Sequence, residues 1–268
     1  MRAPYREHIS WYPFGARPYS RIELTVDALM HLLGTLLTLA AIVFTICVWP
    51  SGSPAILRLS VGVYLLSLLG MFLCSATYNI GLGQYGKDNY HLLSSLDLCG
   101  ICLLIAGTNT PVMAVACCMR TLLFIWALAS LTIATKCHGG MLNTLKLHVP
   151  CFLLMGWSCL IVWGVPYLHA CPLRRFPCHS TLRTPCVSGE VMATFSGRAI
   201  YLFLAGGAIY TIGLIPWGMY HLEFHVCIWH AFVIAASSCF FAALIVIDLS
   251  LMPQKIISCM AVSEPLQL

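Results

Sequence analysis

Charge is what this sequence has least of. Charged residues make up only 9% of the 268 residues, whereas hydrophobic residues make up 60%. An average soluble domain is about a quarter charged, so a water-soluble globule of this length would have too few charges to cover its surface. The scarcity excludes a soluble enzyme and a disordered protein. It also excludes a nucleic-acid-binding domain, because the 14 Lys and Arg residues are scattered between apolar blocks and form no patch.

A cleavable signal peptide is also missing from residues 1–27. This segment contains Arg and Glu residues throughout, and no apolar core precedes a cleavage site. We expect residues 1–27 to form a cytoplasmic tail and the first apolar block to act as an uncleaved insertion signal.

Long apolar blocks are what the sequence has in abundance. A membrane-spanning helix needs about 20 mostly apolar residues. Seven predicted spans run approximately over residues 28–49, 56–78, 93–116, 121–135, 147–168, 199–220 and 226–251. We therefore predict an all-α, multi-pass integral membrane protein. Its seven-helix bundle covers residues 28–251, and a short C-terminal tail covers residues 252–268.

The orientation of this bundle depends on the Lys and Arg residues in its short loops. The two sides carry equal numbers of basic residues, but four arginines precede the first span. The first tail usually dominates, which predicts a cytoplasmic N-terminus. The loop that contains Cys171, Cys178 and Cys186 then faces the lumen or the exterior, where two of these three thiols are able to form a disulfide.

Ionisable side chains at membrane depth are costly and are functional candidates by default. The notable ones inside the predicted spans are His31, Asp97, His230 and Asp248. We interpret Asp248, near the far end of the last span, as an interface residue.

The other three belong with Ser75 and Asn79 at the end of the second span. Asp97 begins the third span, His230 begins the last and His31 lies early in the first, so alternating helix directions place all five near the cytoplasmic surface. A metal-and-water site and a hydrogen-bonded network between helices are both consistent with this pattern.

Five sequence blocks resemble the hemolysin III-related family, which includes the progestin and adipoQ receptors, and look closest to its bacterial-type hemolysin III branch. The first block, ELTVDALMHLLG at residues 23–34, is similar to the family's E-x-x-x-N-x-x-x-H-x-x-G, with Asp27 in place of Asn. The others are LCSATYN at 73–79, LD at 96–97 followed by IAGTNTP at 105–111, LAGGAIYTIG at 204–213, and IWHAFV at 228–233. Their order along a seven-span chain strengthens the resemblance.

The resemblance implies a zinc ion near the cytoplasmic side, held by one His from the second helix and two from the last. It also implies a supporting Ser and Asp, which match Ser75 and Asp97, and ceramide-like lipid amides as substrates of some members. Only His230 of the three ligands is present, since Asn79 and Val226 occupy the other two positions. The family comparison therefore predicts a degenerate zinc site.

A rebuilt metal site is the alternative. His225 lies five residues before His230, about 140° away on a regular helix, so only a π-turn would align the two side chains. Cys227 shares a face with His230, and Asp97 or His91 would supply a third ligand. His225 is otherwise interpreted as a solvated loop residue.

Three functions follow. The first is a receptor-like or membrane-homeostasis protein without the standard zinc site, with membrane lipid as its partner. The second is a zinc-dependent, ceramidase-like lipid amide hydrolase, with His230 as a ligand and Asp97 and Ser75 orienting water. The third is a pore or transporter.

Overall fold

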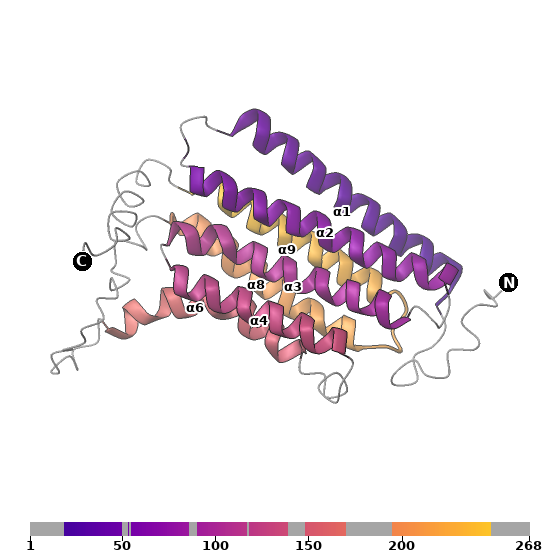
Figure 1. The fold of residues 1–268 in the computed structure, drawn as a ribbon. Helices are drawn as coiled ribbons and strands as arrows, with labels where there is room; N and C mark the ends of the chain where they lie inside the picture. Colours follow the sequence, from indigo (N-terminus) through magenta and orange to yellow (C-terminus); the bar gives the residue numbers. More distant parts are fainter. Residues whose placement is uncertain are drawn as a thin grey trace, which may run out of the picture.

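The structure of the chain, a computed structural model, describes residues 19–49, 53, 55–85, 90–116, 118–138, 148–169 and 195–247. This part of the chain contains seven α-helices and no strand. The helices are α1 (Arg21–Val48), α2 (Ala55–Tyr85), α3 (Tyr90–Val115), α4 (Met119–His138), α6 (His148–His169), α8 (Gly197–Gly218) and α9 (His225–Ile245). They form one bundle with roughly aligned axes, and α1 lies at its edge (Figure 1). The predicted all-α class is confirmed.

Six of these helices are long and apolar enough to cross a membrane: α1, α2, α3, α4, α8 and α9. The surface of α1 shows how such a helix is arranged. Leu29, Leu32 and Leu36 are exposed, whereas His31 and Thr38 are buried. An outer face of leucine suits contact with lipid, and polar side chains turned into the bundle are shielded from lipid. The chain is thus a multi-pass integral membrane protein, as expected.

The first helix begins at Arg21, earlier than the expected Ala28, because a capping box precedes it. The Ser20 hydroxyl accepts a hydrogen bond from the Glu23 backbone N–H at 3.2 Å, and Glu23 Oε2 accepts from the Ser20 N–H at 2.8 Å. These reciprocal bonds satisfy two of the N–H groups that a helix start leaves free. Residues 21–27, which were expected to belong to the tail, are therefore part of α1.

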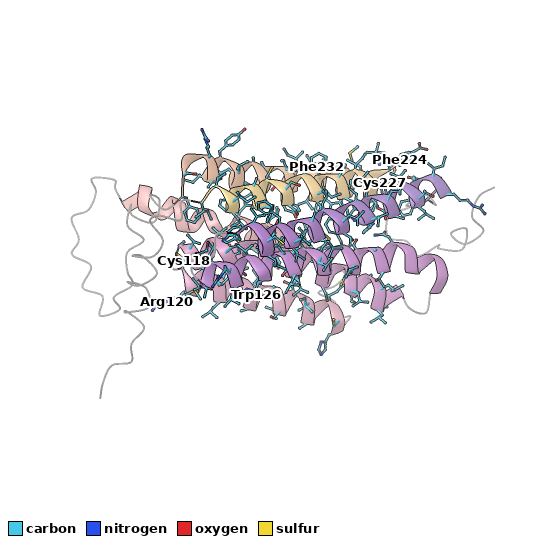
Figure 2. The ribbon with its side chains drawn as sticks, turned by 90° about the horizontal axis from the view of Figure 1, so that it is seen from above. Cys118, Arg120, Trp126, Phe224, Cys227 and Phe232 are labelled. Carbon is cyan, nitrogen blue, oxygen red and sulfur yellow. The ribbon has the colours of Figure 1, made fainter. Side chains whose placement is uncertain are left out.

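The same glutamate joins the starts of α1 and α9. Glu23 Oε1 accepts a hydrogen bond from the backbone N–H of Phe224 at 2.9 Å, and the Cys227 thiol donates to the Glu23 carbonyl at 3.4 Å. Phe224 has a left-handed backbone, with φ of 58°. Figure 2 shows Phe224 and Cys227 at one end of the bundle and Cys118 and Arg120 at the other. The Glu23 contacts thus fix α1 beside α9 at the end that carries the polar residues.

Small residues allow close helix contacts elsewhere in the bundle. A methyl group added at Gly34 of α1 would overlap the Phe72 ring of α2. One added at Gly206 of α8 would lie 2.9 Å from the Phe240 ring of α9. Close approach through small residues is typical of membrane helices. Asp248 and the three loop cysteines Cys171, Cys178 and Cys186 lie outside the described residues.

Candidate functional site

His230 lies at the centre of a buried polar cluster between α9, α1 and α2. Its Nδ1 lies 2.6 Å from Oδ1 of Asp27, and its Nε2 lies 3.3 Å from Oγ of Ser75. A carboxylate oxygen accepts hydrogen bonds, so Nδ1 donates to Asp27, and Nε2 shares the second hydrogen bond with the Ser75 hydroxyl. These two bonds hold the imidazole in one orientation.

Asp27 and His31 lie one turn apart on α1 and face His230 together. His31 Nδ1 donates to the Asp27 carbonyl at 2.8 Å and lies 3.5 Å from Asp27 Oδ2. The ring centroids of His31 and His230 are 4.2 Å apart. All three residues are buried, and one potential metal-ligand atom from each lies within 4.8 Å of the other two. The structure thus brings a carboxylate and two imidazoles to one point.

The second helix supplies the polar groups on the other side of His230. Asn79 Nδ2 donates to the Ser75 carbonyl at 3.0 Å and lies 3.4 Å from the Ser75 hydroxyl. Ser75, Asp97 and His230 line one cavity. The expected water-orienting pair, Ser75 and Asp97, is therefore brought together with the histidine.

His225 and Cys227, the co-ligands that the sequence suggested for His230, have other partners. His225 is buried rather than solvated, because its Nε2 contacts the Tyr19 hydroxyl at 3.2 Å and its Nδ1 donates to the Leu222 carbonyl at 3.1 Å. Cys227 turns toward Glu23, and His91 is exposed at the start of α3. No π-turn interrupts α9, so His225 does not share a face with His230.

The cavity beside His230 is long, mostly apolar and about 110 Å³ in volume. Along α3 its lining runs from Asp97 to Val112, which corresponds to about 22 Å of helix. Gly156 of α6 and Leu204 of α8 both line it and are both exposed, so it opens to the outer surface between these helices. One end is therefore polar, and the remainder is mostly apolar, with Thr108, Asn109 and Thr211 among its lining residues.

The fold and the site together define a helical membrane protein with a buried His and Asp cluster at the end of a lipid-facing cavity. The model of the Haemolysin-III related family matches residues 19–241, and the chain belongs to this family. It is 27% identical to the Hemolysin-3 homolog of Bacillus subtilis over 223 residues, covering 82% of this chain and 91% of that protein. It is also 27% identical to Hemolysin-3 of Bacillus cereus over 227 residues, covering 82% and 89% respectively.

The zinc ligand set implied by the family resemblance does not fit this chain. Asn79 and Val226 line a small cavity of about 10 Å³ together with Asp27, a volume of about one water molecule. A valine offers no ligand atom, and the Asn79 amide is engaged with Ser75. His230 is the single imidazole at the three positions, and one imidazole does not hold a zinc ion.

Asp27 is the residue whose part in the site the sequence did not reveal. In the sequence, Asp27 stands out only because it replaces the Asn of the family pattern. Its i, i+4 spacing from His31 nevertheless places both residues on one helix face. That spacing is a usable signal for a carboxylate and an imidazole acting together. The contact between Asp27 and His230 has no such signal, because it depends on how α1 packs against α9.

Proposed function

We propose that the protein is a receptor-like membrane protein that binds a single lipid chain in the cavity between α3, α6, α8 and α9. The observation that carries this proposal is the cavity itself, which is apolar over most of its length and polar where Ser75, Asp97 and His230 meet. Ligand sites of this kind combine an apolar lining with a few placed polar groups.

The dimensions and the opening of the cavity support a lipid rather than a water-soluble ligand. Its length of about 22 Å along α3 exceeds half of the roughly 30 Å hydrocarbon core of a bilayer. An acyl chain is able to enter sideways past Gly156 and Leu204 without leaving the apolar phase. The polar head of the lipid then contacts the hydroxyl, carboxyl and imidazole groups at the polar end of the cavity.

The same lining argues against an aqueous pore through this part of the bundle. Apart from the phenol of Tyr210, the ionisable side chains among the described lining residues are Asp97 and His230. These two side chains lie at the same end of the cavity. An ion path needs polar groups along its length, and the middle of this cavity has few.

A pair of glycine variants tests lipid binding. A side-chain carbon added at either Gly156 or Gly70 meets no atom within 4 Å, but only Gly156 lines the cavity. We expect Gly156→Leu to lower the affinity for a fluorescent single-chain fatty acid about tenfold, because the added isobutyl group occupies the space of the chain. Gly70→Leu should bind as the wild type does, and the readout is fluorescence titration in detergent micelles.

Equal affinity of both variants would contradict the proposed cavity. The same samples, incubated with a ceramide and followed by mass spectrometry, separate binding from chemistry. Release of fatty acid by the wild type would support the amide hydrolase alternative, whereas binding without release would support the receptor-like function.

A further inference from the structure

We propose that Asp27, His31 and His230 bind one divalent transition-metal ion of the zinc class. The proposal concerns the α1 side of His230, does not depend on lipid binding, and uses a ligand set different from the one implied by the family resemblance. Two ligands come from one turn of α1 and the third from α9, and all three side chains are buried.

The ligand types suit such an ion. Two imidazoles and one carboxylate form a set that zinc uses in catalytic sites, where a fourth position stays open. Imidazole nitrogen favours transition metals, whereas Mg²⁺ and Ca²⁺ favour an all-oxygen shell. One ligand atom from each residue lies within 4.8 Å of the other two, so the three side chains are close enough to share one ion.

A second observation comes from the ring nitrogen of His31 that makes no hydrogen bond. His31 Nδ1 donates to the Asp27 carbonyl, so Nε2 of the neutral ring carries a lone pair. Nε2 is fully buried and has no hydrogen-bond partner among the described residues, and His31 is only 2% exposed. A buried polar atom without a partner is costly and calls for an explanation. A metal ion supplies the missing partner.

The charge of Asp27 gives a third, independent reason. Within the described part of the chain, the ion-pair partners of this carboxylate are His31 and His230, and no Lys or Arg reaches it. A buried carboxylate in a membrane helix is costly unless it is paired or hydrogen-bonded, and an opposite charge beside it lowers this cost. A divalent ion provides that charge permanently. Asp27 also lines the small cavity formed with Tyr19 and Asn79.

The hydrogen bonds around the cluster resemble those that orient metal ligands. In metal sites, the second ring nitrogen of a histidine usually donates to a carboxylate or a backbone carbonyl. His31 already donates to the Asp27 carbonyl in this way. His230 Nδ1 points at the Asp27 carboxylate, and it binds an ion shared with that carboxylate once it has released its proton. One aspartate thus holds both rings in place before an ion arrives.

The test measures Zn²⁺ binding to detergent-purified full-length protein by competition with a chromophoric chelator. We expect one Zn²⁺ per chain for the wild type and an affinity at least about 100-fold lower for Asp27→Asn and for His31→Gln, since each removes a ligand. The matched controls are His225→Gln and Cys227→Ser, which change a buried imidazole and a thiol on the same helix outside the cluster. Their affinities should stay within about threefold of the wild type.

Failure of a variant to fold is covered by a second measurement on the unaltered protein. The absorption spectrum of the wild type with Co²⁺ should show visible bands from nitrogen and oxygen ligands and no thiolate charge-transfer band. Absence of stoichiometric Zn²⁺ in folded wild type, unchanged affinity in Asp27→Asn, or loss of the ion in Cys227→Ser would each overturn the proposal. Fatty-acid binding is measured separately, so the two proposals succeed or fail independently.

Discussion

Two buried polar clusters include residues of the same helix, α9. They differ in whether all of their polar groups have hydrogen-bond partners. Around Ser237, the Tyr64 hydroxyl donates to the Ser237 carbonyl at 2.8 Å, and the hydroxyls of Tyr210 and Ser237 are 2.8 Å apart. This cluster is neutral, and each hydroxyl has a partner. The cluster around His230 contains a carboxylate and leaves His31 Nε2 without a described partner.

The difference separates a structural role from a binding role. A neutral network with all its hydrogen bonds made holds helices together, and nothing further needs to bind there. A cluster that keeps a lone pair and a carboxylate among imidazoles is set up for an additional cation. With the proposed ion, the polar residues of α9 would have a structural role around Ser237 and a binding role around His230.

Removal of the residue shared by the metal cluster and the cavity should have the largest effect. His230→Gln takes away a ligand and a lining side chain, so we expect Zn²⁺ affinity to fall at least about 100-fold and fatty-acid affinity to fall about threefold. Ser237→Ala serves as the control for a polar loss on the same helix. Zinc binding that survives in His230→Gln and disappears in Ser237→Ala would reverse the roles given to the two clusters.

The second-largest effect is expected for a substitution at the contact between α1 and α2, which should lower the stability of the protein. Gly34→Ala forces the buried Phe72 ring to move, which we expect to cost about 1–3 kcal/mol of unfolding free energy. Gly70→Ala on α2, where the added carbon meets no atom within 4 Å, should be neutral or slightly stabilising. Thermal melting in detergent compares the two, and equal melting temperatures would refute the tight contact.

The smallest effect is expected in the satisfied cluster. Tyr64→Phe removes the hydroxyl that donates to the Ser237 carbonyl and should cost about 1 kcal/mol of stability. Zn²⁺ affinity should stay unchanged, since the cluster around His230 does not include Tyr64. A loss of zinc with an unaltered melting temperature would show that the two clusters are coupled.

The sequence predicted the fold well because apolar length alone identifies membrane helices. Hydropathy predicts the helices but sets the start of α1 at Ala28, because hydropathy does not detect a capping pair such as Ser20 and Glu23. The sequence does contain the signal for this capping pair, which is the pattern S-x-x-E just before an apolar run.

The site was predictable only in part. Ser75, Asp97, His31 and His230 were expected at one depth, and helix direction is enough to show it. The burial of His225 against Tyr19 and the contact of Asp27 with His230 join residues about 200 positions apart, on helices whose rotation hydropathy does not define. The cavity depends on the same rotations, together with the missing side chain of Gly156.

X-ray absorption at the zinc edge of protein loaded with one equivalent of Zn²⁺ tests the proposed metal site most directly. We predict a first shell of nitrogen and oxygen only, at about 2.0–2.2 Å, with the outer-shell scattering of two imidazole rings. Scattering from sulfur at about 2.3 Å would place the ion on a cysteine such as Cys227 and would contradict the site formed by Asp27, His31 and His230.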